Sequence, residues 1–209
     1  MNSLVEIKNF LAPASTFYDQ KFEFIFVLDR SGSMSGSKIL LARRALILFL
    51  RSLPTSCMFN VVGFGSTFEH LFPDSVEYSE IALENAINYA KEMKANLSGT
   101  ELLEPLQNIY NSKQHNGYLT QIFVLTDGEV SRPSDVMKLI EGRKHRCRVF
   151  SLGIGRGASR KLVDGIAQVG GGTSIYANDN EKIETKILHQ LKIALQPSLL
   201  KAIPVSARG

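Results

Sequence analysis

The sequence predicts an α/β fold, in which a doubly wound and mostly parallel central sheet carries helices on both faces. Strand-like and helix-like segments alternate along almost all of the 209 residues, as expected when helices connect parallel strands. Several strand-like segments are continuous apolar runs, which indicates strands buried on both faces. Two of these runs end in an acid, Asp29 and Asp127, and open sheets of this kind bind ligands beyond the carboxyl ends of their strands.

The first half of the chain predicts two main strands and two helices. Residues 22–29, FEFIFVLD, form an apolar run typical of a central strand. Residues 37–53 carry apolar side chains on more than one side of a helix, and a proline ends them. Residues 57–65 predict a second strand, and the alternating residues 67–72 predict a short edge strand. A helix is predicted over 79–94, with an inner side made of Ile81, Leu83, Ala86, Ile87 and Ala90.

The second half continues the alternation after a polar loop, NLSGT, at residues 96–100. Hydrophobic periodicity and the glycines and prolines between segments predict the remaining elements. These are a short helix over 101–110, a strand over 121–130, a helix over 133–142, a strand over 148–155, a helix over 159–170, a strand over 172–177 and a last helix over about 180–195.

The length and composition suit one globular domain with short extensions. Hydrophobic residues make up 44% and charged residues 21% of the chain, which is ordinary for a folded domain. We expect residues 1–21 to be an N-terminal connector, residues 22–196 to form the domain, and residues 197–209 to be a C-terminal tail or linker.

Charge and cysteine content argue against several classes of protein. The formal net charge of +4 is too small to predict a nucleic-acid partner, and the basic run Gly142–Arg148 is expected to be a solvated helix end. Cys57 and Cys147 each open an apolar run and are expected to be buried reduced thiols, which favours an intracellular protein. The sequence contains no signal-like or membrane-spanning apolar run, so we expect a cytoplasmic protein without a membrane span.

Five oxygen-bearing side chains form the candidate site. Asp29, Ser31 and Ser33 follow the first strand at two-residue spacing, so that they can point to one side of a tight loop. The polar loop adds a hydroxyl from Thr100, and the end of a later strand adds the carboxylate of Asp127. Hard oxygen ligands of this kind suit Mg²⁺, and also Mn²⁺ or Ca²⁺.

These five residues resemble the metal-ion-dependent adhesion site (MIDAS) of the von Willebrand factor type A (vWA) domain. The resemblance covers Asp29-x-Ser31-x-Ser33, then the Thr in SGTE and the Asp in TDGE, and extends over about residues 22–196. It implies the Rossmann-like vWA fold. The stretches FIFVLDRSGSM, GTELLEPLQNIY and VLTDGEV are most similar to vWA domains that follow an inter-alpha-trypsin-inhibitor-like (VIT) domain, in the group called von Willebrand factor A domain-containing protein 5A.

The resemblance implies a role for each site residue. Ser31 and Ser33 would bind the metal directly, and Thr100 would do so when a ligand is bound. Asp29 and Asp127 would act mainly through bound water. The metal then keeps an open position for a Glu or Asp of a partner protein. The resemblance thus implies a binding device and not an enzyme. The VIT resemblance also implies a larger chain, in which a VIT-like domain precedes the connector.

Two alternatives remain open at this point. The domain could be a structural module whose metal site is occupied but unused. Less favoured is a dinucleotide-binding enzyme, because Gly153-x-Gly155-x-x-Ala158 follows a strand and precedes a helix, with Asp179 about twenty residues later. Arg30, between the first two site residues, is expected to be solvated or to steer an acidic partner.

Overall fold

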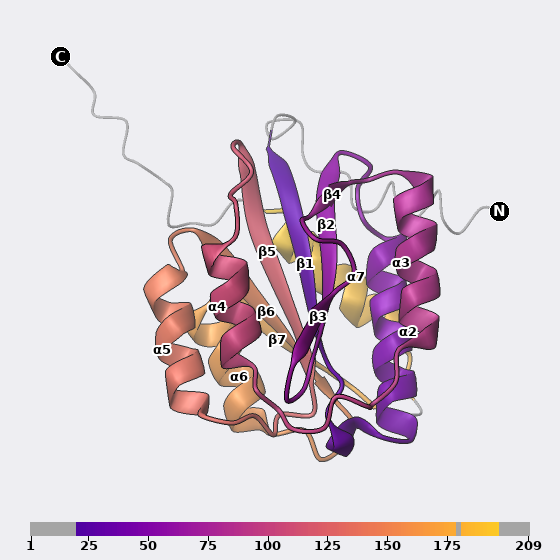
Figure 1. Ribbon diagram of the computed structural model, residues 1–209, viewed down its shortest axis with the longest axis vertical. Helices are drawn as coiled ribbons and strands as arrows, with labels where there is room; N and C mark the ends of the chain where they lie inside the picture. The colour runs from indigo at the N-terminus through magenta and orange to yellow at the C-terminus, as the bar shows by residue number, and fades with distance from the viewer. Residues whose placement is uncertain (1–19, 179–180, 197–209) are drawn as a thin grey trace.

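The computed structural model of the protein describes residues 20–178 and 181–196. Within them a central sheet is covered by helices on both faces (Figure 1), which confirms the predicted fold class. The elements, in chain order, are β1 (Lys21–Asp29), the 3₁₀ helix η1 (Gly32–Met34), α2 (Ser37–Arg51), β2 (Cys57–Phe64), β3 (Phe68–His70), β4 (Val76–Glu77), α3 (Glu80–Glu92), α4 (Leu103–Asn111), β5 (Tyr118–Thr126), α5 (Pro133–Arg143), β6 (Cys147–Ile154), α6 (Arg160–Val169), β7 (Gly171–Ala177) and α7 (Glu184–Ala194).

The sheet is parallel except at one edge. Its strand order is β3-β2-β1-β5-β6-β7, and β4 also pairs with β2. The pairs β1–β2, β1–β5, β5–β6 and β6–β7 are parallel, whereas β3 and β4 run antiparallel to β2. The short antiparallel strand β3 confirms the edge strand predicted over 67–72. The two-residue strand β4 was not predicted, because two residues are too few to show a periodicity.

The order of the strands reverses at β1. The chain passes from β1 to β2 on one side, and later returns to place β5 on the other side of β1. The carboxyl ends of β1 and β5 are therefore neighbours at a topological switch point, where such sheets form ligand sites. This end of the sheet is the lower one in Figure 1, where η1 and the start of α2 also lie.

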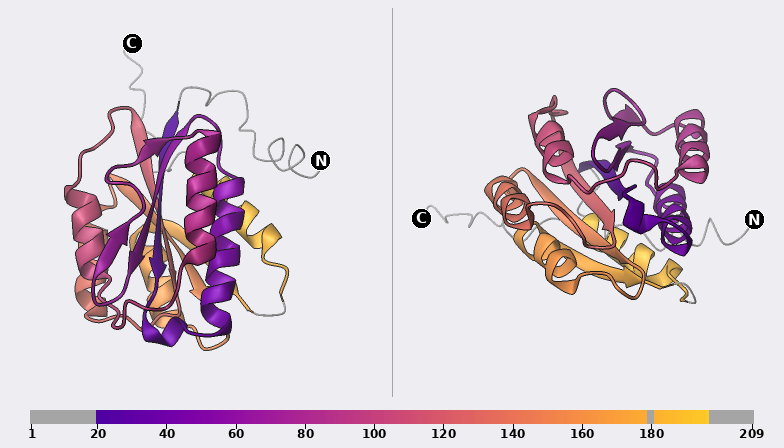
Figure 2. Two further views of the ribbon diagram at one scale, coloured as in Figure 1. Left: turned by 45° about the vertical axis from the view of Figure 1, so that its right-hand side comes forward. Right: turned by 60° about the horizontal axis from the view of Figure 1, so that its bottom comes forward.

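Alternating side chains of the strands pack into two separate hydrophobic cores, one on each face of the sheet. In β1, Phe24 and Phe26 face α2, α3 and α7, whereas Ile25 and Val27 face α4, α5 and α6. Figure 2 shows the two helical layers on opposite sides of the sheet. In the first core the rings of Phe123 and Phe150 stack with centroids 4.8 Å apart. Because β1 is buried on both faces, its sequence is a continuous apolar run.

Two predictions about the helices are corrected. Ile81 was assigned to the inner side of the helix over 79–94, but it is 75% exposed on the first turn of α3, while Leu83, Ala86 and Ala90 are buried. The last helix begins at Glu184 instead of about residue 180. Most of the predicted connector and all of the predicted tail lie outside the described residues.

The two cysteines are free and buried, as predicted. Burial raises the pKa of the Cys57 thiol to about 12 and that of Cys147 to about 11. Both groups are therefore protonated at neutral pH. None of the helices that the structure describes is long and apolar enough to cross a membrane.

Candidate metal centre

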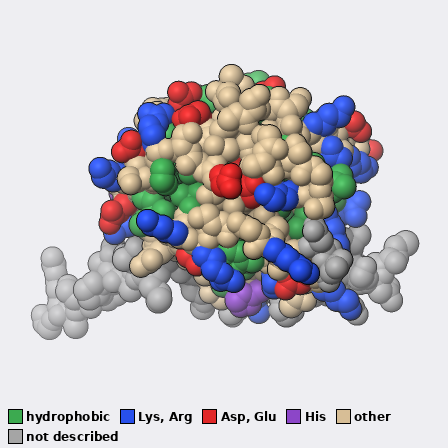
Figure 3. All heavy atoms as spheres, turned by 90° about the horizontal axis from the view of Figure 1, so that it is seen from below, with side chains coloured by type: hydrophobic (Ala, Val, Ile, Leu, Met, Phe, Trp, Pro, Cys, Tyr) green, Lys and Arg blue, Asp and Glu red, His purple; other side chains and the backbone are tan. Residues whose placement is uncertain are grey.

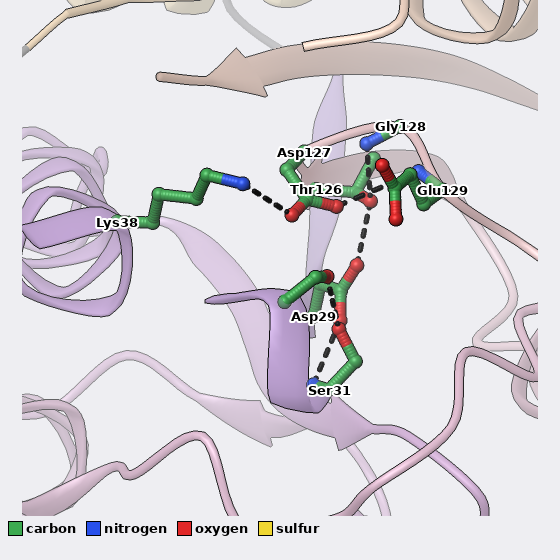
Figure 4. A network of polar contacts seen from close by, with 8 residues as sticks. Asp29, Ser31, Lys38, Thr126, Asp127, Gly128 and Glu129 are labelled. Carbon is green, nitrogen blue, oxygen red and sulfur yellow. Dashed lines mark hydrogen bonds and ion pairs between the residues drawn. The ribbon is translucent and has the colours of Figure 1, made fainter. Parts of the chain in front are cut away.

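Asp29 is the last residue of β1, and its side chain is fully buried. One carboxylate oxygen, Oδ1, accepts a hydrogen bond of 2.9 Å from the backbone N–H of Ser31. The other, Oδ2, accepts one of 2.7 Å from the hydroxyl of Thr126, at the end of β5. The carboxylate thus ties the turn after β1 to the neighbouring strand (Figure 4).

The surroundings of Asp29 disfavour its negative charge. Burial raises its pKa, the bonds from Thr126 and Ser31 lower it by a smaller amount, and the nearby carboxylate of Asp127 raises it further. A cation placed between the two acids would relieve both desolvation and mutual repulsion. A positive charge close to Asp29 would therefore stabilise its buried carboxylate.

Ser31 and Ser33 lie on the tight turn that η1 forms after β1. Their hydroxyl oxygens are 3.0 Å apart, so the two-residue spacing does bring them to the same side, as predicted. Ser31 is buried, and Ser33 is partly exposed. The pair therefore holds two hydroxyl oxygens side by side in the turn.

Backbone hydrogen bonds hold the loop that leads to Thr100 beside this turn. The N–H of Gly32 donates to the carbonyl of Ser98 at 3.0 Å, and the N–H of Leu97 donates to the carbonyl of Arg30, also at 3.0 Å. On the other side, the N–H of Ser131 donates to the carbonyl of Thr100 at 3.0 Å. The polar loop predicted at residues 96–100 thus lies between the segments that carry the other candidate residues.

The expectation for Arg30 is wrong, because its side chain is only 7% exposed. Its guanidinium donates to Glu69 at 2.7 Å, to the side chain of Asn96 at 2.6 Å and to the carbonyl of Lys94 at 3.0 Å. It packs over Gly63, where an added Cβ would lie 2.6 Å from the Cδ of Arg30. Arg30 therefore braces the loop that leads to Thr100, and it is not available to a partner.

Asp127 directly follows β5 and is 1% exposed. Its Oδ2 accepts a hydrogen bond of 2.9 Å from the ammonium of Lys38, a residue on the first turn of α2 whose side chain is 33% exposed. The sequence analysis missed Lys38. The lysine and the acid are 89 residues apart, and a lone lysine at the start of a helix gives no signal of this contact.

The cluster offers oxygen atoms only. Within residues 20–178 and 181–196, no three His, Cys, Asp or Glu side chains are grouped so that they could hold a metal ion. A metal here therefore depends on the hydroxyls as well as on the two carboxylates. This donor set fits hard divalent cations and does not fit a structural zinc site of thiolates and imidazoles.

Comparison with known proteins identifies the family of the domain. A family model described as the von Willebrand factor type A domain matches residues 22–176. Human von Willebrand factor A domain-containing protein 5A is 47% identical over 186 residues, which is 84% of this chain. The same alignment covers 23% of the human protein, so this chain spans about a quarter of the length of that relative.

Solved structures share the fold at low sequence identity. Manganese-loaded Plasmodium vivax TRAP protein superposes with a TM-score of 0.64 at 20% identity, over 84% of this chain and 74% of the other. Proximal thread matrix protein 1 from the mussel byssus, with a zinc-occupied MIDAS motif, gives 0.67 at 18% identity, over 86% and 48%. With the sheet, the family match and the relative of high identity in agreement, the chain belongs to the von Willebrand factor type A domain family.

Proposed function

We propose that this domain is a divalent-cation-dependent module for binding proteins. Mg²⁺, or Mn²⁺ or Ca²⁺ in its place, binds Ser31, Ser33 and Thr100 through their hydroxyls, and Asp29 and Asp127 hold it mainly through water. When bound, the ion supplies a positive centre with an open coordination position. A Glu or Asp of the partner protein fills that position.

The observation that carries this proposal is the 3.0 Å distance between the hydroxyl oxygens of Ser31 and Ser33. Mg²⁺ binds oxygen at about 2.0–2.1 Å in octahedral geometry. Adjacent oxygens of such an octahedron are therefore about 2.9 Å apart, the metal–oxygen distance multiplied by the square root of two. The two hydroxyls are already separated by one edge of the coordination shell.

The charges around the site support capture of an acid. Hydroxyl ligands add no charge, and the carboxylate of Asp127 is already paired with Lys38. The ion is then less neutralised than it would be by direct carboxylate ligands, and it attracts an outside carboxylate more strongly. The manganese and zinc named for the two similar structures support a divalent cation in general, and the hard oxygen donors are the reason to favour Mg²⁺.

Calorimetric titration of the metal-free domain with Mg²⁺, Mn²⁺ and Ca²⁺ tests the site. We expect Ser31→Ala and Asp127→Ala to weaken metal binding by tenfold or more while the domain stays folded, since each removes a donor or a charge. Ser35→Ala, at an exposed position of the same turn, is the matched control. Unchanged titrations for both site variants would show that the metal is not bound there.

Two alternatives are separated from this proposal by direct experiments. If the metal site is occupied but unused, chelation with EDTA will leave capture of partner proteins unchanged. A dinucleotide-binding enzyme is less supported, since its glycines have a packing role: a Cβ on Gly153 would lie 2.6 Å from the ring of Tyr176, and Gly155 has a φ of +82°. Micromolar binding of NAD or NADP in calorimetry would nevertheless favour the enzyme.

We also propose that the domain works within a longer cytoplasmic protein that carries an N-terminal VIT-like domain. The support is its similarity to protein 5A, of which it matches 23% of the length. Sequencing the full transcript tests the VIT-like domain, and imaging of the tagged full-length protein tests the location. A transcript without a VIT-like segment, or a secreted product, would contradict this part of the proposal.

A further inference from the structure

We propose that a groove beside the metal centre binds a bulky apolar side chain of the partner, one to three residues from the acid that the metal captures. The occupant is thus an extended peptide segment that combines an Asp or Glu with a nearby Leu, Ile, Met or Phe. This inference rests on the function proposed above, and it adds the kind of sequence that the site recognises.

The groove lies between the N-terminal ends of α5 and α6 and has a volume of about 490 Å³. Its apolar lining comes from Val130, Pro133, Met137 and Leu162. Of these, Pro133 is exposed and Val130 and Met137 are partly exposed, so apolar surface remains open to a visitor. The volume lies within the range of about 300–1,000 Å³ usual for ligand pockets, which is enough for a large side chain and part of its backbone.

Hydrogen bonds join the wall of the groove directly to the metal centre. The N–H of Ser159 donates to the carbonyl of Asp127 at 3.0 Å, and the N–H of Gly128 donates to the hydroxyl of Thr126 at 3.0 Å. Gly128 and Ser159 both line the groove. In Figure 4, Gly128 and Glu129 continue from Asp127 along the side of the site away from Lys38. The groove therefore lies directly beside the metal centre.

This continuity sets the spacing of the two anchors. Gly128 and Glu129 are one and two residues from Asp127, hence about 4–8 Å away along the chain. An extended peptide advances about 3.3 Å per residue. A partner whose acid reaches the metal can therefore place a side chain one to three positions away into the groove.

The charged groups around the groove favour an acidic segment. Lys161 lines it on the α6 side, and the ammonium of Lys38 lies on the other side of Asp127. Both α5 and α6 begin at the groove, and helix N-termini add a modest preference for negative charge. Glu129 supplies the opposing charge on the rim. Figure 3, which looks onto this end, shows hydrophobic side chains bordered by charged ones on the side of α5 and α6.

The test begins with a display library of twelve-residue peptides that have a fixed central Asp or Glu and random flanks. Peptides are selected on the Mg²⁺-loaded domain and eluted with EDTA. We expect enrichment of Leu, Ile, Met or Phe one to three positions from the acid. The best peptide is then synthesised and titrated against groove variants.

Ser134→Trp fills the groove from an exposed position of its lining, and Met137→Gln makes the lining polar at nearly constant volume. Both variants should bind the peptide about tenfold or more weakly, the loss of affinity expected when one large apolar side chain stays in water. Lys138→Trp, at an exposed position of α5 outside the groove lining, should leave binding unchanged. Mg²⁺ affinity should be the same in all three variants.

The outcomes separate this inference from the function on which it rests. EDTA-eluted peptides without an apolar preference, or equal binding by Ser134→Trp and Lys138→Trp, would overturn the groove and leave metal-dependent binding standing. A library that yields no EDTA-sensitive peptide would overturn both. Loss of Mg²⁺ binding in the groove variants would overturn the inference, because it would show that the groove residues support the metal centre and do not bind the partner's side chain.

Discussion

Replacing Lys38 by methionine tests the electrostatics of the metal centre. The ammonium of Lys38 lies 2.9 Å from Oδ2 of Asp127, so it holds the place of a cation at this carboxylate. Methionine keeps the apolar stem, which packs near Gly155, and removes only the charge. Two consequences follow, one for metal affinity and one for the stability of the metal-free fold.

The affinity for Mg²⁺ should increase by about sevenfold. Because Asp127 holds the ion mainly through water in the proposed site, the ion lies about 4 Å from its carboxylate and roughly 7 Å from the ammonium. Repulsion between charges of +2 and +1 at that distance is about 1.2 kcal/mol in water and about 5 kcal/mol at an effective dielectric constant of 20. Because the side chain of Lys38 is 33% exposed, we take the lower value, and about 1.4 kcal/mol corresponds to tenfold.

The metal-free fold should lose stability in the same variant. Asp127 is 1% exposed, and a buried carboxylate left without its partner costs about 1–3 kcal/mol. For a domain of this size that lowers the melting temperature by about 2–12 °C. Saturating Mg²⁺ should restore most of the loss, because the ion replaces the missing positive charge.

Calorimetry and thermal melting, each with and without Mg²⁺, measure both effects. Lys138→Met is the matched control, because it removes the same charge from an exposed position of α5. The reasoning is refuted if Lys38→Met binds Mg²⁺ no more tightly than the wild type and melts at the same temperature without metal.

Three further predictions concern residues around the site and the core. Arg30→Ala should lower the free energy of unfolding, measured in urea, by about 2–4 kcal/mol, since a buried charge-assisted network is lost. Arg51→Ala, at an exposed helix end, is the control. Equal losses in the two variants would show that the hydrogen bonds of Arg30 do not stabilise the fold. The Cys57 and Cys147 thiols should react with a disulfide reagent only after unfolding. Rapid labelling of the native protein would contradict this. The folded pKa values of the two thiols are raised to about 12 and about 11. Their contribution to the free energy of unfolding is therefore complete below about pH 9 and is lost as the pH rises toward those values. Arg148→Met should speed amide exchange in the last turn of α7, whose carbonyls accept bonds from Arg148 at 2.6–3.2 Å; unchanged exchange would rule out that anchoring role.

Local pattern was enough to predict most of the fold. Buried parallel strands produce apolar runs, and packed helices produce a 3.6-residue period, so both can be recognised without knowing what they touch. The same holds for the two carboxylates at strand ends, because the carboxyl ends of parallel strands lie at one edge of the sheet. The start of the last helix and the burial of Ile81 depended on neighbours, and these two predictions were wrong.

The sequence by itself determined the fold class and the oxygen-bearing side chains at its switch point, since both follow from local spacing and residue type. Only the tertiary structure decided which charges pair. It placed Lys38 on Asp127 and buried Arg30 over Gly63, whose missing side chain makes room for it. It also placed the guanidinium of Arg148, which belongs to a run expected to be solvated, in hydrogen bonds with carbonyls at the end of α7. Coulombic pairing and close packing act through space between residues far apart in the chain, and so no local pattern records them.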